Sequence, residues 1–375
     1  MDKKHGTPFD WEKDRKEFWF ASLQRIRHDR KREIRERIRD IKQLYDRTLW
    51  NAEINDFLTI QEKQYLQDSQ NVDLLARNYE PVAKGEVQFV TCLQPQYPRR
   101  LRPYTDAPYA LFYKGELPSE LGFTVGVVGA RKCSTYGEKY AREISEILAE
   151  AGVEVISGMA SGIDGISQRA AIEVGGRSYG VLGCGVDVCY PKQHKGLYAD
   201  LITHGGVISE QPLGTQPLGM YFPMRNRIIS GLSDILIIIE AKRKSGSLIT
   251  ADQAIEQGKE VYVLPGNIDS NLSEGCNYLI KQGANILLSP QLFLEEQEKH
   301  LQNYSKNNRK KAPIEKIVLE MEEDLVYSSI MSQSKNITQI ISETNLPISI
   351  LINILVSLEL KGYIREVTKN NYIRI

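Results

Sequence analysis

The sequence lacks net charge, paired cysteines and long apolar runs. Its 48 Lys and Arg balance 48 Asp and Glu, so an anion site must be a local concentration of basic residues. The five cysteines form no CxxC pair and no histidine stands at metal-ligand spacing, which disfavours structural zinc. No apolar run approaches the roughly 20 residues of a membrane span, and the amino terminus shows no apolar leader. We therefore expect a cytoplasmic protein with no membrane contact, no metal and no cofactor.

The residues that are present divide the 375-residue chain into several units. Residues 1–84 show three- and four-residue apolar spacing and predict a small, mildly basic helical domain. Residues 85–290 begin with a proline-rich, extended lead-in and continue as a strand-and-helix domain. The polar stretch 291–312 predicts a linker. Residues 313–375 predict two short helices and a hairpin, the pattern of a winged helix.

The predicted winged helix is poor in groups that read bases. Leu, Ile and Glu dominate its second helix, and leucine side chains do not recognise base edges. The pattern therefore favours a partner-binding or structural role over duplex recognition.

The central domain is organised around residues 123–137, FTVGVVGARKCSTYG. A β-branched apolar run breaks at a small-residue turn and continues as a polar helix start, which predicts a strand–loop–helix unit. Five later segments repeat this arrangement, at residues 153–164, 178–191, 206–214, 234–251 and 260–267. A parallel sheet with right-handed crossovers would place all six loops along one edge.

The first of these loops is the strongest candidate anion site. Arg131 lies between Gly129 and the helix start at residues 134–137, where loop N–H groups and the helix dipole favour an anion. An arginine can direct two N–H donors at one phosphate, and the alternative is a bridge to a carboxylate at the sheet edge. The neighbouring Cys133 is expected to be a small filler and not a reactive thiol.

Further loops add glycine and positive charge. Gly158 and Gly162 would let the backbone approach a ligand closely, whereas Asp164 suits a helix cap. Arg225 and Arg227 stand at a helix start, where the dipole disfavours cations, and this placement argues for function. The basic run at residues 242–244 precedes a Ser-Gly helix start and predicts another phosphate contact.

No catalytic machinery accompanies these loops in the sequence. We find no carboxylate pair at acid–base spacing and no Ser–His–Asp set. A row of phosphate-binding loops without such groups favours a binder of a long polyanion over an enzyme.

Eight ordered segments carry a resemblance to a known family. They span about 165 residues and read VGARKCSTYG, SGMASGID, VLGCGVDVCYP, ISEQPLG, FPMRNRIISGLS, EAKRKSGSLITA, VLPGN and EGCNYLIKQGA. In this order they resemble the DNA-processing protein family DprA, also called Smf. The resemblance implies an extended Rossmann-like parallel sheet that binds single-stranded DNA, forms a homodimer and hands the strand to the recombinase RecA during natural transformation.

The resemblance also implies individual roles. Arg131 matches an arginine that holds DNA phosphate, and Lys192 matches a basic position after Tyr-Pro. Residues 225–227 match the family's RNR, and residues 244–247 match its KSGS. The candidate nucleic-acid-binding residues are Gly129, Arg131, Ser134, Gly137, Ser157, Gly158, Gly162, Lys192, Arg225, Asn226, Arg227, Lys244, Ser245, Gly246 and Ser247.

Two departures from the family pattern and two alternative functions stay open. Ser167 and Gln168 stand where the family usually has Ala-His, and residues 26–30 replace a glycine-bearing helix-hairpin-helix turn. One alternative is a LOG-type phosphoribohydrolase, although the PGGxGTxxE segment of those enzymes is missing. The other is a transcription regulator led by the winged helix. We also expect that removing residues 1–80 spares strand binding, because the candidate loops all follow Phe123.

Overall fold

The computed structural model describes residues 11–297, 323, 326, 329–330, 335–344, 346–360, 364–368 and 370–374. The chain separates into two compact units, Met1–Asn308 and Arg309–Ile375.

A nine-stranded sheet forms the centre of the first unit, with the strand order β1-β2-β6-β5-β4-β3-β7-β8-β9. Strands β3 to β9 are parallel, and β1 and β2 add to β6 as an antiparallel edge. The strands are β1 (Gln88–Thr91), β2 (Ala110–Gly115), β3 (Thr124–Gly129), β4 (Glu154–Ser157), β5 (Ser178–Val181), β6 (Gly205–Ser209), β7 (Ile235–Ile239), β8 (Glu260–Val263) and β9 (Asn285–Ile286). The six predicted units begin with β3 to β8, so the mostly parallel α/β sheet is confirmed.

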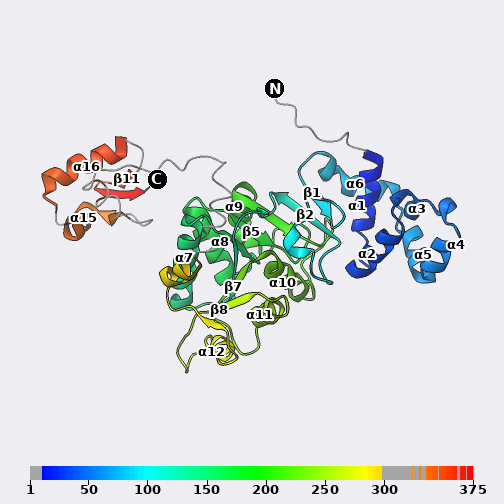
Figure 1. The fold of residues 1–375 in the computed structure, drawn as a ribbon. Coiled ribbons are helices and arrows are strands. Elements are labelled where there is room, and N and C mark those ends of the chain that lie inside the picture. Colours follow the sequence, from blue (N-terminus) through cyan, green and yellow to red (C-terminus); the bar gives the residue numbers. More distant parts are fainter. Residues whose placement is uncertain are drawn as a thin grey trace. The chain divides into compact units, whose positions relative to one another are not determined.

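Helices cover both faces of this sheet (Figure 1). Those of the central domain are η2 (Arg99–Leu101), α7 (Thr135–Glu150), α8 (Ile163–Glu173), η3 (Lys192–His194), α9 (Lys195–His204), α10 (Tyr221–Leu232), α11 (Gly246–Glu256) and α12 (Glu274–Lys281). Alternate residues of β3 show the layering, because Val125 and Val127 pack in the core with α7 and α8, whereas Val128 packs with α10 and α11. This two-residue alternation buries both faces of a strand that reads as a continuous apolar run.

The amino-terminal helices pack against the antiparallel edge. They are α1 (Trp11–Ala21), α2 (His28–Arg37), α3 (Ile41–Tyr45), η1 (Arg47–Leu49), α4 (Ala52–Phe57), α5 (Ile60–Asp68) and α6 (Val72–Ala83). Phe18 of α1 meets Phe89 of β1 and Phe112 of β2 edge-to-face, with ring centroids 5.6 and 5.8 Å apart. One hydrophobic core therefore includes both the helices and the sheet edge.

This shared core bears on the expectation that strand binding survives the removal of residues 1–80, which stays a prediction. Removing them would expose Phe89, Tyr109 and Phe112, which are packed under α1. The sequence spacing revealed apolar helix faces but not what they pack against.

The predicted linker 291–312 begins too early. Residues 290–297 are helical, Phe293 is buried, and its ring lies 4.8 Å from that of Tyr262. Gln297 also donates a hydrogen bond to the Tyr262 hydroxyl at 3.2 Å. One aromatic anchor is enough to fix this short segment, although its average composition is polar. The remaining linker residues, 298–312, lie outside the described residues.

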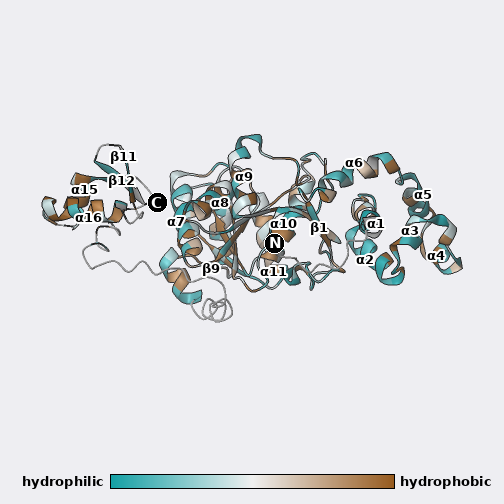
Figure 2. Cartoon of the chain, turned by 90° about the horizontal axis from the view of Figure 1, so that it is seen from above, coloured by the Kyte–Doolittle hydropathy of each residue, from teal (hydrophilic) through white to brown (hydrophobic). Residues whose placement is uncertain are grey.

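The second unit contains a helix pair and a three-stranded sheet of order β10-β12-β11. Its described elements are β10 (Lys335–Asn336), α15 (Ile337–Thr344), α16 (Ile348–Leu360), β11 (Ile364–Thr368) and β12 (Asn371–Arg374). Both helices carry hydrophobic patches (Figure 2). In the part of the chain that the structure describes, no single helix meets the requirements of a membrane span, although the bent pair α15–α16 meets them when taken together.

Candidate nucleic-acid interface

The main cleft of the first unit lies where the strand order reverses. From β3 the chain moves through β4, β5 and β6 in one direction, and it then crosses to β7, β8 and β9 on the other side. The loops after β3 and β7 diverge at this switch point, which is where sheets of this kind bind ligands. A cavity of about 900 Å³ opens there, lined by the loop after β3, the start of α10 and the start of α11.

Four cationic side chains line this cleft, of which Arg225 is buried and the other three are exposed. Arg131 and Lys132 follow β3, and Lys242 follows β7; all three are exposed. Arg131 takes part in no ion pair among the described residues, and neither Lys132 nor Lys242 does. The cleft therefore offers positive charge to a ligand. Lys242 belongs to the basic run 242–244 that the sequence singled out, whereas Lys132 was not part of the predicted site, although it is adjacent to Arg131.

The start of α11 closes the cleft on the β7 side. Ser245, Gly246 and Ser247 all line the cavity, as the sequence predicted. No side chain caps this helix, because the Ser245 hydroxyl instead lies 2.9 Å from that of Ser247. The first N–H groups of α11 thus lack a side-chain acceptor, which favours an anion at this helix start.

The backbone N–H groups of the glycine loops were expected to bind a ligand, but they bind the carboxylate of Asp164 instead. Its carboxylate accepts hydrogen bonds from the N–H groups of Gly129, Gly158 and Ala160, at 3.1 Å in the case of Gly158. A side chain at Gly158 would collide with this carboxylate and with Arg225. Complete burial raises the pKa of Asp164 above its usual range.

Glu240 fills the start of α7 in the same way. It accepts hydrogen bonds from the backbone N–H of Ser134 at 2.8 Å and from the Ser134 hydroxyl. A Cβ at Gly137 would lie 2.4 Å from the Glu240 carboxylate, so glycine leaves space for that group. Ser134 and Gly137 therefore contact an internal carboxylate, which corrects the prediction that they face a ligand.

The predicted RNR residues point to two different places. Arg225 is buried and donates hydrogen bonds to the carbonyl oxygens of Gly158, at 2.7 Å, and of Val181. Asn226 lines the cleft and donates to the Gly246 carbonyl at 3.1 Å, which ties α10 to α11. Arg227 does not line the cleft. It is buried against Glu210 on the opposite side of α10.

Burial also shifts the pKa values of Arg225 and Cys133. It lowers the pKa of Arg225 to about 10, and Arg225 stays protonated at neutral pH. It raises the pKa of the Cys133 thiol, which agrees with the predicted filler role.

The other predicted residues lie outside the cleft or inside the core. Ser157 donates to the Val127 carbonyl at 2.6 Å and is fully buried. A Cβ at Gly162 would meet the backbone of Ala130 and Arg131, so this glycine serves close loop packing. Lys192 is exposed in η3 and does not line the cleft. Lys244 is exposed beside a neighbouring groove with Arg243.

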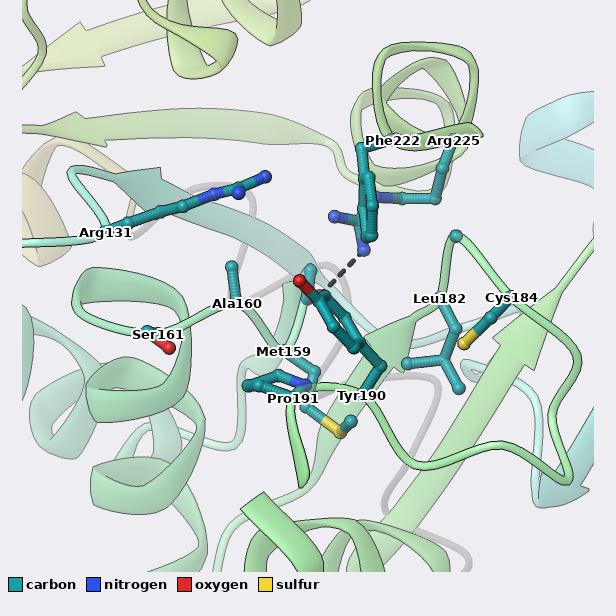
Figure 3. Close-up of a pocket in the computed structure, with 12 residues that line it drawn as sticks. Arg131, Met159, Ala160, Ser161, Leu182, Cys184, Tyr190, Pro191, Phe222 and Arg225 are labelled. Carbon is teal, nitrogen blue, oxygen red and sulfur yellow. Dashed lines mark hydrogen bonds between the residues drawn. The ribbon is translucent and has the colours of Figure 1, made fainter. Parts of the chain in front are cut away.

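An aromatic pair forms a side pocket of about 50 Å³ next to the cleft (Figure 3). The rings of Tyr190 and Phe222 lie 5.5 Å apart, and Tyr190 is 40% exposed. Arg131 and Arg225 approach Phe222 with guanidinium carbons 5.5 and 5.9 Å from the ring centroid. Neither aromatic residue was part of the predicted site, because a single aromatic residue has no periodic signal.

Gln168 explains one departure from the family pattern. Its side chain accepts from the Met159 N–H and donates to the Tyr179 carbonyl, each at 3.0 Å. It therefore joins the loop after β4 to β5 from a fully buried position. A glutamine here supports the loop and does not reach the cleft.

A second polar cluster joins the amino-terminal helices to α10. The His28 Nε2 lies 2.9 Å from Glu210, which also pairs with Arg227, and the His28 Nδ1 accepts a hydrogen bond from the backbone N–H of Tyr109 at 3.1 Å. Burial lowers the pKa of His28, so we assign the neutral ring with its proton on Nε2. Lys31 is also buried and donates to the Ala21 carbonyl at 2.7 Å.

We expect the free energy of unfolding to increase as the pH rises from about 7 to about 10, because of the lowered pKa of Lys31. Burial lowers the pKa of Lys31 from 10.5 to about 7, so the unfolded chain binds a proton in this range that the folded chain has released. Denaturant titrations should show a smaller rise in the free energy of unfolding between these pH values for Lys31→Met than for the parent. The exposed control Lys42→Met should behave like the parent. An equal dependence of the free energy of unfolding on pH in the parent and Lys31→Met would contradict this assignment.

Comparison with known proteins places this architecture in a family. The family model described as DNA recombination-mediator protein A matches residues 88–298. Protein Smf of Escherichia coli is 48% identical over 200 residues, which is 53% of this chain and 54% of that protein. The match thus spans about half of that relative's length.

Two solved structures are similar as well. The X-ray structure of DprA from Streptococcus pneumoniae has a TM-score of 0.64 and 34% identity, and it covers 78% of this chain and 99% of its own. A structure of DNA processing protein A from Helicobacter pylori, whose title describes a single-stranded DNA binding mode, has a TM-score of 0.52 and 28% identity over 57% of this chain and 97% of its own. The chain belongs to the DNA recombination-mediator protein A family, DprA or Smf.

Proposed function

We propose that this protein binds single-stranded DNA in the cytoplasm and passes it to the RecA recombinase during natural transformation, without catalysing a reaction itself. The observation that carries the proposal is the cleft at the switch point, where Arg131, Lys132 and Lys242 line one cavity and form no ion pair among the described residues. Cations at such spacing suit a ligand with several phosphates. The names of the Streptococcus pneumoniae and Helicobacter pylori proteins support a role in DNA processing.

The aromatic pair explains why the strand should be single. Phe222 and Tyr190 lie at the cleft edge beside Arg131, and an unpaired base can stack on such rings. In a duplex the same base faces are already stacked. The geometry therefore supports a division in which cations hold phosphates and the rings select unpaired bases.

Phe222→Ala tests this division. We expect single-strand affinity to fall by about 1–3 kcal/mol per lost stack, roughly five- to 150-fold, with little change for duplex of equal length. Electrophoretic shifts with both forms of DNA, with and without RecA, would measure it. Met224→Ala is the matched control, because Met224 lies on the same helix but lines a different cavity. A parent protein that bound duplex as tightly as single strands would contradict the function.

A phosphoribohydrolase-like enzyme is not favoured by the cleft. Its buried carboxylates are already engaged, Asp164 by backbone N–H groups and Glu240 by Ser134. Asp164 lines the cavity, but its carboxylate is held by these N–H groups and is not a free acid or base. Release of free base from a nucleoside monophosphate would be the result that revives this alternative.

We assign the homodimer interface to the outer edge of the sheet at β9. Ile286 and Leu288 are 43% and 70% exposed there, at an edge whose parallel partner β8 lies on one side. Pairing of two such edges would cover both side chains. Light scattering at micromolar concentration should show a dimer that Leu288→Asp converts to monomers. A parent particle of 42.6 kDa would count against the assignment.

For the carboxyl-terminal unit we propose a winged-helix fold that contacts protein and not duplex DNA. Helix α16 contains no basic residue, and Ile348, Ile352 and Val356 are about half exposed along one side of it. An aliphatic stripe offers no hydrogen bond to a base edge. Footprinting of the full chain on duplex DNA should therefore show no protection.

A further inference from the structure

We infer that Asp164 and Glu240 act as built-in anions that keep single phosphates out of the switch-point cleft, so that the protein selects polymeric strands over free phosphate, pyrophosphate and mononucleotides. This inference rests on the proposed function and adds a selectivity mechanism to it.

In a sheet of this kind a nucleotide normally binds beyond the carboxyl ends of the strands. Loop N–H groups and helix starts at the carboxyl edge bind one phosphate or pyrophosphate group strongly, because several fixed donors converge on it. Here the donors after β3 and β4 converge on the Asp164 carboxylate instead. The N–H and hydroxyl of Ser134, at the start of α7, are directed at Glu240.

Backbone geometry shows that the Glu240 placement is specific. Glu240 has φ = +56°, in the left-handed region that a residue with a side chain rarely adopts. This conformation directly follows β7 and is accompanied by the carboxylate's two bonds to Ser134. Gly137 lies under the same carboxylate, where any Cβ would collide with it. A strained residue, a required glycine and two donors thus hold one negative charge in place.

The cations that remain for a ligand are solvent-exposed side chains. Arg131, Lys132 and Lys242 come from two separate loops, and each contact of this kind is weak in water. A lone phosphate can engage few of them and also meets the negative charge of Asp164, which lines the same cavity. A strand engages several at once, and the weak contacts add up.

Pyrophosphate is the discriminating probe. The parent should bind oligothymidylate but give no thermal shift with pyrophosphate, whereas Glu240→Ala should open the start of α7 and bind pyrophosphate. We expect the ratio of oligothymidylate to pyrophosphate affinity, measured by calorimetry, to fall at least about tenfold. Glu240→Gln keeps the size and the acceptor and loses the charge, so it should give a smaller change in the same direction and provides a second variant should Glu240→Ala fold poorly.

The alternative is that Glu240 only ties α7 to β7. Folded variants that were less stable but bound pyrophosphate no better than the parent would overturn the inference. Parent protein that bound pyrophosphate as tightly as its variants would overturn it as well. Failure of the parent to bind oligothymidylate would instead contradict the proposed function, and the pyrophosphate comparison between parent and variants could still be made.

Discussion

Arg131→Ala should bind single strands about ten- to a hundredfold more weakly than the parent and remain folded. Arg131 is exposed in the cleft and makes no ion pair among the described residues, so its loss leaves no buried charge without a partner. One charge-assisted contact to phosphate is worth roughly 1.5–3 kcal/mol, which corresponds to this range of affinity. Because phosphates carry no sequence information, the loss should be similar for all strand sequences.

Salt dependence gives an independent test of the same contact. The slope of log K against log salt should become shallower by about 0.7 for each lost phosphate contact on single strands. Lys139→Ala is the matched control, since Lys139 is exposed on α7 but does not line the cleft. An Arg131→Ala protein that bound as tightly as the parent at about 0.15 M salt would show that this loop is structural.

Phe18→Ala should destabilise the whole first unit by about 3–5 kcal/mol, the usual cost of removing a buried phenylalanine ring. Phe18 is 1% exposed and contacts Tyr79, Phe89 and Phe112 edge-to-face. Since these rings belong to both the helices and the sheet edge, thermal melting should remove helical signal and strand binding together. The control Ile60→Ala, at an 84% exposed position, should leave the midpoint unchanged. Separate melting of the helices, with binding retained, would show that the two parts fold independently.

The sequence predicted the sheet well because its signals are local. Each of β3 to β8 is an apolar run that ends at a glycine or charged loop, and parallel pairing brings these loops to one edge. Arg131 could be placed in the cleft on this basis alone. The same holds for Ser245 and Gly246, which follow β7 at the start of a helix.

The parts that sequence reasoning could not supply depend on contacts between distant residues. Whether Arg227 points into the cleft or away from it is decided by Glu210 and by the amino-terminal helices, which no local pattern near α10 reveals. Similarly, Glu240 lies 106 positions from Ser134 in sequence, so nothing in the first loop indicated that its helix start was already filled. Glycines that were expected to face a ligand instead make room for these internal groups.

Helix α10 connects the cleft with the amino-terminal helices. Phe222 and Arg225 on one side of it line the cleft, and Arg227 on the other side meets the cluster of His28 and Glu210. The segment shared with the family model starts at residue 88, yet the packing that supports α10 starts within α1 and α2. The segment that matches the family model is therefore shorter than the segment that packs together in the folded protein. An exchange of central domains between relatives should succeed only when the matching amino-terminal helices are carried along.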